Sequence, residues 1–120
     1  IILHMKKISN KVSEMKKGLS ETCNRFFTVL GNPTRLATLE TLLDGPMNVT
    51  QIAETLGQEQ SMISHNLKPL VECRFVYVER RGKERVYSVN RGTVDPLFKV
   101  VENHADSYCP SGGRCLAREG

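Results

Sequence analysis

Apolar residues in the first part of the chain recur with the spacing of amphipathic helices. The first such run starts at Ser20, and its apolar positions are Cys23, Phe26, Phe27 and Leu30. Positions i, i+3, i+4 and i+7 share one helix face, and Gly31 is a suitable C-terminal stop. Asn32 and Pro33 then give an N-cap residue followed by proline at the first helical position, which predicts a second helix. The apolar stripe of that helix is Leu36, Leu39, Leu42 and Leu43.

Two shorter helices are predicted after the break at Asp44-Gly45-Pro46. Asn48 and Gln51 have the spacing of a capping box, which predicts the start of the third helix, and Gly57 predicts its end. A fourth helix is expected at 61–73, where apolar residues again share one face. These residues are Ile63, Leu67, Leu70 and Val71. Two short helices joined by a tight turn predict a helix-turn-helix.

The pattern changes to alternation near residue 75. Segments 75–80 and 85–89 are rich in strand formers, and the short sequence Arg81-Gly82-Lys83-Glu84 between them predicts a β-hairpin. Asp95-Pro96 predicts the start of a last helix, and the Pro-Ser-Gly-Gly sequence at 110–113 predicts its end. The expected fold is therefore mainly α with a small β-hairpin. It is a winged helix-turn-helix in the order α-α-α-α-β-β-α, and we expect it to be dimeric.

Charge and hydropathy narrow the class of partner. The net charge is +4 and the isoelectric point is near 9.0, which favours a polyanionic partner. No stretch approaches the about 20 apolar residues of a membrane helix, and nothing in the sequence signals export. We therefore expect a cytoplasmic protein with no membrane partner. In that compartment the four cysteines should be reduced thiols, which bind soft metals and react with oxidants.

The fourth helix and the hairpin together predict an interface for double-stranded DNA. The polar residues opposite the apolar stripe of the helix are Gln60, Ser61, Ser64, His65, Asn66 and Lys68. Such side chains bond base edges and phosphates in the major groove, although an ordinary solvated face has the same composition. The hairpin carries the cations Arg80, Arg81, Lys83 and Arg85. They suit phosphate contact, or they discourage pairing with foreign strands. A polar helix face that is followed along the chain by a cationic hairpin favours DNA as the partner.

A chain of 120 residues has room for one hydrophobic core. We expect the DNA-binding and dimerisation domain at residues 20–107. Residues 1–19 are rich in lysine and form an N-terminal basic arm, for which a solvated tail is the plainer interpretation. Residues 108–120 form a C-terminal tail that contains two cysteines. Apolar residues on the first and last helices exceed what one small core needs, which predicts a two-fold dimer. They are Phe26, Phe27, Leu30, Leu97 and Val101, with His104 beside them.

Three motifs resemble the ArsR/SmtB family of metal-responsive repressors. They are Leu30-Gly31-Asn32-Pro33-Thr34-Arg35-Leu36-Ala37-Thr38-Leu39, the helix-turn-helix at 52–57 and 61–70, and the wing at 81–89. The resemblance covers about residues 20–89. It implies a homodimer with the first and last helices at the interface, and an operator-bound repressor that an inducer releases. Cys73-Arg74-Phe75 differs from the family, which usually has small residues and a glycine turn after the recognition helix.

Cysteines are the candidate sensor residues. Cys109 and Cys115 flank a glycine-rich loop that can fold both sulfurs around one soft ion such as As(III), Zn(II) or Cd(II). The resemblance adds Cys23 as a candidate third ligand, because the family dimer brings first and last helices together. Cys23 also suits a plain packing role, since buried cysteine behaves as a small hydrophobe. Cys73 and His104 are reserve ligands.

Three functions remain open at this point. The first is a repressor released by a soft metal or metalloid, and the second is a repressor that responds to oxidants or sulfide through a cysteine disulfide. The third is a winged-helix module that binds protein or RNA and has no sensor. An enzyme is not expected, because the sequence contains no phosphate-cradling glycine loop, serine elbow or paired-histidine zinc motif.

Overall fold

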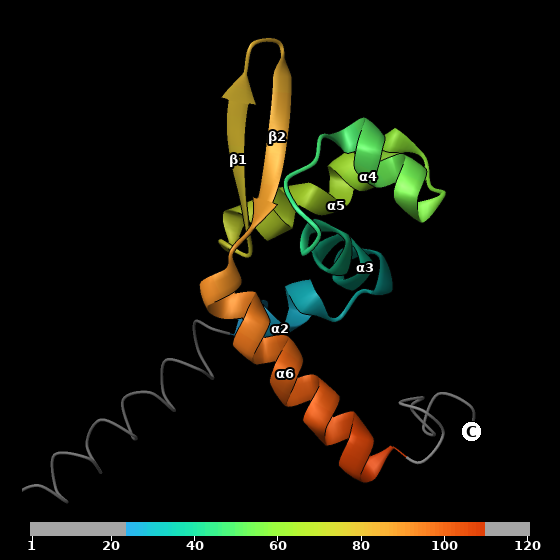
Figure 1. Ribbon diagram of the computed structural model, residues 1–120, viewed down its shortest axis with the longest axis vertical. Coiled ribbons are helices and arrows are strands. Elements are labelled where there is room, and N and C mark those ends of the chain that lie inside the picture. The colour runs from blue at the N-terminus through green and yellow to red at the C-terminus, as the bar shows by residue number, and fades with distance from the viewer. Residues whose placement is uncertain (1–23, 110–120) are drawn as a thin grey trace, which may run out of the picture.

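The structure is a computed structural model, and it describes residues 24–109. Its elements are α2 (Asn24–Leu30), α3 (Pro33–Leu42), α4 (Val49–Leu56), α5 (Gln60–Glu72), β1 (Val76–Arg81), β2 (Glu84–Val89) and α6 (Arg91–Tyr108). Figure 1 shows α4 and α5 on one side of the β1–β2 hairpin, which projects away from the helices, while α6 extends in the opposite direction. The winged helix-turn-helix prediction is confirmed. None of the helices in the described range is long and apolar enough to cross a membrane.

The helix boundaries near the helix-turn-helix follow from local capping, as predicted. The Asn32 Oδ1 atom accepts a hydrogen bond from the Arg35 N–H at 3.1 Å, with Pro33 at the first position of α3. Asn48 and Gln51 form a reciprocal capping box at the start of α4. Gly57 ends α4 with a φ of 63°, a conformation that glycine adopts without steric cost. Loss of one such N-cap costs a helix about 1 kcal/mol.

The hydrophobic core lies between α3, α4, α5 and the base of the hairpin. Its fully buried side chains include Leu39, Leu42, Ile52, Ile63, Leu67, Leu70, Phe75, Val76 and Val94. Phe26 of α2 joins this core, since its ring lies edge-on to Phe75 with the two centroids 4.8 Å apart. The core therefore holds the back of α5 and leaves the opposite face of that helix in solvent.

The hairpin has a tighter turn than expected. Arg81 and Glu84 pair across the strands, so the connection is Gly82-Lys83, with Gly82 at a φ of 63°. The outer edge of β2 is also paired, because the Met47 N–H donates to the Tyr87 carbonyl at 3.0 Å and the Tyr87 N–H donates back at 2.8 Å. Met47 lies just before α4, so this bridge joins the wing to the helix-turn-helix.

The start of the last helix was predicted wrongly. It begins at Arg91, one turn before Asp95-Pro96, and Pro96 lies inside it. Val94 is fully buried, and this burial places the first turn of α6 against the core. The Asn90 side chain donates to the Arg74 carbonyl at 2.7 Å and to the Thr93 hydroxyl at 3.3 Å. Tertiary contacts therefore extend the helix beyond the position that the Asp-Pro signal indicates.

Arg74 occupies the turn between α5 and β1 in a left-handed conformation. Its φ is 63°, a left-handed conformation that glycine usually provides after the end of a helix. The Arg74 N–H donates to the Val71 carbonyl at 3.1 Å and the Phe75 N–H donates to the Leu70 carbonyl at 2.9 Å. These bonds close the end of α5 and place Phe75 in the core. The left-handed backbone of Arg74 costs about 1 kcal/mol or more, and the burial of Phe75 in the core offsets this cost.

Candidate DNA interface and sensor region

The outward face of α5 presents five of the six predicted groove residues. They are Gln60, Ser61, Ser64, His65 and Lys68, and all are exposed. The helix is held from behind by Ile63, Leu67 and Leu70, which are buried. An α-helix fits the major groove, where amide, hydroxyl and imidazole groups can bond base edges. The structure therefore brings together, on one exposed face, the residue types that such recognition requires.

Asn66 is the exception, and its predicted outward position is wrong. It is only 6% exposed and lies on the buried face of α5. Its Oδ1 atom accepts from Arg35 Nε at 3.0 Å, and its Nδ2 donates to the Met62 carbonyl at 3.0 Å. The physical reason is periodicity. Residue 66 is three positions after Ile63 and four before Leu70, so it belongs to the apolar stripe and not to the face opposite it.

Met62 is a surface residue that the sequence pattern did not single out. It lies among the polar residues of α5 and is 50% exposed. An apolar side chain at the groove face can contact the methyl group of thymine. Its position one residue before Ile63 was the available signal, because it falls outside the i, i+4, i+7 series of the buried stripe.

The wing places its four predicted cations in solvent around one tip. Arg80, Arg81, Lys83 and Arg85 are all exposed. Arg81 pairs with Glu84 in the register, and its guanidinium lies 3.4 Å from Glu79 Oε2. Arg80, in contrast, lies directly opposite Arg85. Like charges at directly opposed positions repel, so this pair is stabilised when an anion approaches.

A side-chain bond also ties the wing to the helix that precedes α5. The Asn48 Nδ2 atom donates to Glu84 Oε1 at 3.1 Å. Asn48 is at the same time the N-cap of α4. Together with the Met47–Tyr87 bridge, this bond holds the base and the tip of β2 against the start of the helix-turn-helix.

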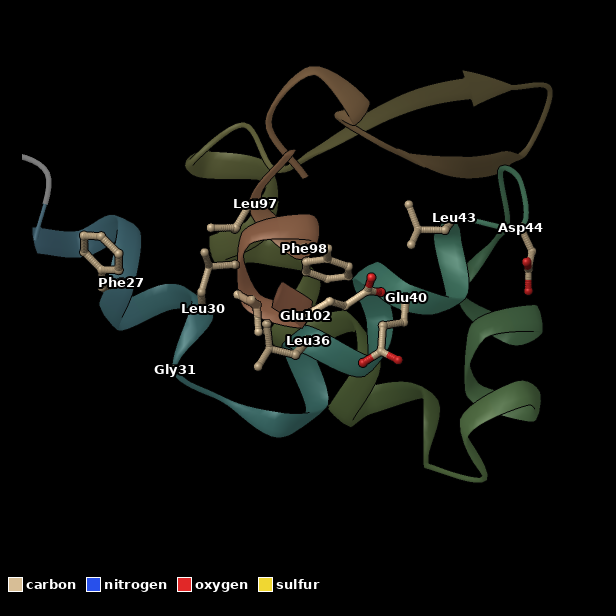
Figure 2. Close-up of a pocket in the computed structure, with 11 residues that line it drawn as sticks. Phe27, Leu30, Gly31, Leu36, Glu40, Leu43, Asp44, Leu97, Phe98 and Glu102 are labelled. Atoms are coloured by element: carbon tan, nitrogen blue, oxygen red, sulfur yellow. The ribbon is translucent and has the colours of Figure 1, made fainter. Parts of the chain in front are cut away.

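The opposite end of the molecule contains an apolar groove of about 690 Å³ between α2, α3 and α6. Figure 2 shows Leu30, Leu36 and Phe98 gathered at its centre, with Phe27 and Asp44 at opposite ends. Four of the six residues predicted for dimerisation line this groove, namely Phe27, Leu30, Leu97 and Val101. Phe26 instead packs into the core, and His104 lies against Tyr108 with ring centroids 5.0 Å apart.

The predicted sensor is only partly within the described residues. Cys109 follows α6 directly and is half-buried, and its N–H donates to the Ala105 carbonyl at 2.8 Å. Cys23 and Cys115 lie outside residues 24–109. Cys73 is half-buried and packs against the core. Within the described range, no three histidine, cysteine or carboxylate side chains come together as metal ligands, so these residues do not form a metal site by themselves.

Comparisons with known proteins match this architecture. The family model described as "Bacterial regulatory protein, arsR family" matches residues 32–78, which run from the N-cap of α3 into β1. The transcriptional regulator NmtR of Mycobacterium tuberculosis is 43% identical over 77 residues, which is 64% of each chain. A Streptomyces lividans protein named "Probable mercury resistance operon repressor" is 39% identical over 99 residues, or 82% of this chain and 70% of that one. The chain belongs to the arsR family.

A solved structure of a protein described as "a possible ArsR-family transcriptional regulator" supports the same fold. It is the homodimeric winged helix-turn-helix DNA-binding domain of Mb0332 from Mycobacterium bovis. That chain is 30% identical to this one and superposes with a TM-score of 0.69. The match covers 78% of this chain and 86% of that one. As a member of the arsR family, this chain is a DNA-binding transcriptional regulator and not an enzyme.

Proposed function

We propose that this arsR-family protein is a homodimeric repressor that reads operator DNA with α5 and holds the phosphate backbone with its wing. One observation carries the proposal. The exposed polar face of α5 is next in the fold to a hairpin whose tip pairs Arg80 with Arg85. A groove-reading helix beside exposed cations is the arrangement that sequence-specific DNA binding requires.

The two parts of this surface have different roles. Ser64 and His65 lie in the middle of the exposed face, where a side chain reaches deepest into the groove, and Gln60 and Ser61 are at the N-terminal end of α5. These residues supply base contacts, which distinguish sequences. Arg80, Lys83 and Arg85 supply phosphate contacts, which add affinity for any duplex and weaken as salt rises.

The groove between α2 and α6 supports a dimer. Its rim residues Phe27 and Val101 are 63% and 56% exposed, although both are large apolar side chains. Such a surface is stabilised when a partner covers it. A second copy that packs about a two-fold axis would bury this surface and place two recognition helices about 34–36 Å apart, one turn of DNA. The relative from M. bovis is homodimeric, which supports a dimer of this chain.

The inducer in this proposal is a thiol-reactive agent, most simply a soft metal or metalloid such as As(III), Zn(II) or Cd(II). Cys109 and Cys115 are the candidate ligands in the tail, and Cys23 is the third. The name of the S. lividans relative refers to mercury, another thiophilic ion. An alternative is a disulfide formed from two of these cysteines when an external oxidant accepts their two electrons, or a sulfur bridge formed between them by sulfide together with such an oxidant. Cys109 directly follows α6, and earlier turns of α6 line the dimer groove, so either change would act on a helix of that groove.

The proposal is tested with a duplex that the full-length protein selects from a random-sequence pool. Replacement of Ser64 and His65 by alanine should weaken binding to this duplex by about 10-fold or more, because each good base contact is worth about 1–3 kcal/mol. Binding to a scrambled duplex should be unchanged. Lys99, an exposed residue of α6, gives the control variant Lys99→Ser. Failure to select any duplex, or equal loss on both duplexes, would contradict base reading by α5.

A further inference from the structure

Arg35 connects three helices through its guanidinium group. It lies at the third position of α3, where the Asn32 side chain caps its N–H. Its Nη1 donates to the Val29 carbonyl in the last turn of α2 at 3.3 Å, and its Nε donates to Asn66 Oδ1 in α5 at 3.0 Å. The carbonyls of a last helical turn lack partners within the helix, so a cation there is favourable. One side chain therefore joins the groove helix α2 to the DNA-facing helix α5.

The orientation of the Asn66 amide is determined by its two partners. Its Nδ2 donates back to the Met62 carbonyl at 3.0 Å, which leaves Oδ1 to face Arg35. Asn66 is 6% exposed, so water does not replace Arg35 if this bond breaks. A buried acceptor without a donor is strongly unfavourable. The bond is thus directional and costly to lose, unlike the contacts of its neighbours.

The remaining anchors of α5 have a different character. Ile63, Leu67 and Leu70 are fully buried, and hydrophobic burial stabilises the helix against the core without specifying its rotation sharply. A rotation of α5 by about 20° would move side-chain tips, which lie about 5–6 Å from the axis, by about 2 Å. A shift of that size breaks hydrogen bonds to base edges, which require donor–acceptor distances near 3 Å.

We propose that Arg35 and Asn66 form a positioning pair that sets the rotation of α5, so that sequence discrimination by the exposed face depends on this buried bond. The inference rests on the proposed function, since it assumes that α5 reads DNA. Neither residue contacts DNA in this proposal. The pair also links α5 to α2, which lines the groove, and gives a route by which a change at the groove alters base reading.

The experiment compares the selected duplex with a scrambled duplex of equal length, using the full-length protein. Asn66→Leu removes the acceptor and keeps a similar volume, and it should lower affinity for the selected duplex by about 10-fold while it changes affinity for the scrambled duplex by less than about twofold. Asn66→Asp keeps an oxygen for Arg35 but loses the donor to the Met62 carbonyl, so it should recover most, and not all, of the affinity for the selected duplex that Asn66→Leu loses. Rescue by the aspartate variant distinguishes positioning from general destabilisation.

Two further variants keep the test sharp. Thr41→Val removes a buried hydroxyl that bonds only within its own helix, to the Ala37 carbonyl at 2.9 Å, and it should leave discrimination unchanged. Arg35→Met keeps a long unbranched side chain but has no donor for Asn66 Oδ1, and it should reproduce the Asn66→Leu phenotype, which covers the case in which the leucine variant does not fold. The double variant Arg35→Met/Asn66→Leu should lose no more discrimination than the worse single variant, because both remove one bond.

Several outcomes would overturn the inference. They are parental discrimination in folded Asn66→Leu or in Arg35→Met, equal losses on both duplexes, and additive losses in the double variant. A parent protein that selects a duplex, combined with any of these results, refutes the positioning pair alone. A parent that selects no duplex refutes the proposed function together with this inference.

Discussion

The two ends of this molecule differ in how completely their surfaces are satisfied. At the end that carries α5 and the wing, which we propose faces DNA, α3 and α4 have side-chain N-caps and the apolar side chains behind α5 are buried. Hydrogen bonds join α3 to α5 and the wing to α4. At the α2–α6 end, an apolar groove is open and Phe27, Val101 and Tyr108 are more than half exposed. One protomer is therefore sufficient to build the proposed reading surface, whereas the proposed dimer needs a second copy to cover the groove at the other end.

The largest effect is expected from a cavity in the DNA-facing end. Leu67→Ala should lower the free energy of unfolding by about 2–5 kcal/mol, because Leu67 is 1% exposed behind the reading face. Chemical denaturation checks this value. Val78→Ala on the hairpin is the control, since Val78 is 44% exposed and should cost little. Similar losses in the two variants would mean that the core is not centred on α5.

The second prediction addresses the open end. Val101→Asp places a charge on the groove and should convert the dimer to a monomer with little change in helix content. Affinity for the selected duplex should then fall by about 100-fold, because two linked half-sites bind far more tightly than one. Sedimentation and fluorescence anisotropy measure the two effects. A Val101→Asp protein that stays dimeric would exclude this groove as the interface.

The third prediction concerns the signal that reaches the open end. The double replacement Cys109→Ser/Cys115→Ser should leave operator affinity at the parental level and abolish release by As(III), Cd(II) or oxidant. In the parent, release corresponds to a coupling of about 1–3 kcal/mol, or about 5- to 150-fold in affinity. Thiol titration and metal content, measured anaerobically, separate metal binding from disulfide formation. Undiminished release from the double variant would place the sensor elsewhere, and a parent without any response would favour a module that lacks a sensor.

The smallest effects are expected at the tip of the wing. Lys83→Gln should reduce affinity for all duplexes alike and lower the salt dependence by about one counterion for the lost phosphate contact. Arg80→Thr should do the same and should also raise stability by about 0.2–1 kcal/mol, because it removes repulsion from Arg85 across the hairpin. Binding over a salt series and thermal unfolding test these statements. A salt slope that stays parental would show that the wing does not contact phosphates.

Most of the fold could be predicted where the signals are local. Asn32 and Asn48 act on N–H groups three residues away, and Gly57 ends α4 through its own backbone conformation. Such signals are readable in a short window of sequence. The start of α6 was not, because the buried Val94 and the Asn90 bond to the Arg74 carbonyl depend on residues far along the chain. Asp95 and Pro96 lie inside α6 and do not start it.

The candidate site shows the same division. Polar residue type alone suggested that Asn66 faces DNA, but its position in the stripe with Ile63 and Leu70 and its bond to Arg35 place it inside. Exposure of Ser64 and His65 followed from the period of the helix. The bond across 31 residues between Arg35 and Asn66 had no local signal. The contacts of Cys23 and Cys115 lie outside the described range, so the three-cysteine set stays a prediction.

The Met47–Tyr87 bridge has a consequence for how this fold can vary in length. The connector between α3 and α4 pairs with β2 through Met47, and in the next residue it caps α4 through Asn48. An insertion there would shift the strand pairing of Met47 relative to the helix cap at Asn48. The connector therefore tolerates little change in length. The Gly82-Lys83 tip takes part in neither contact, so lengthening it leaves the Met47 pairing and the Asn48 cap intact. Relatives that contact longer stretches of DNA are therefore expected to gain residues at the tip and to keep the connector constant.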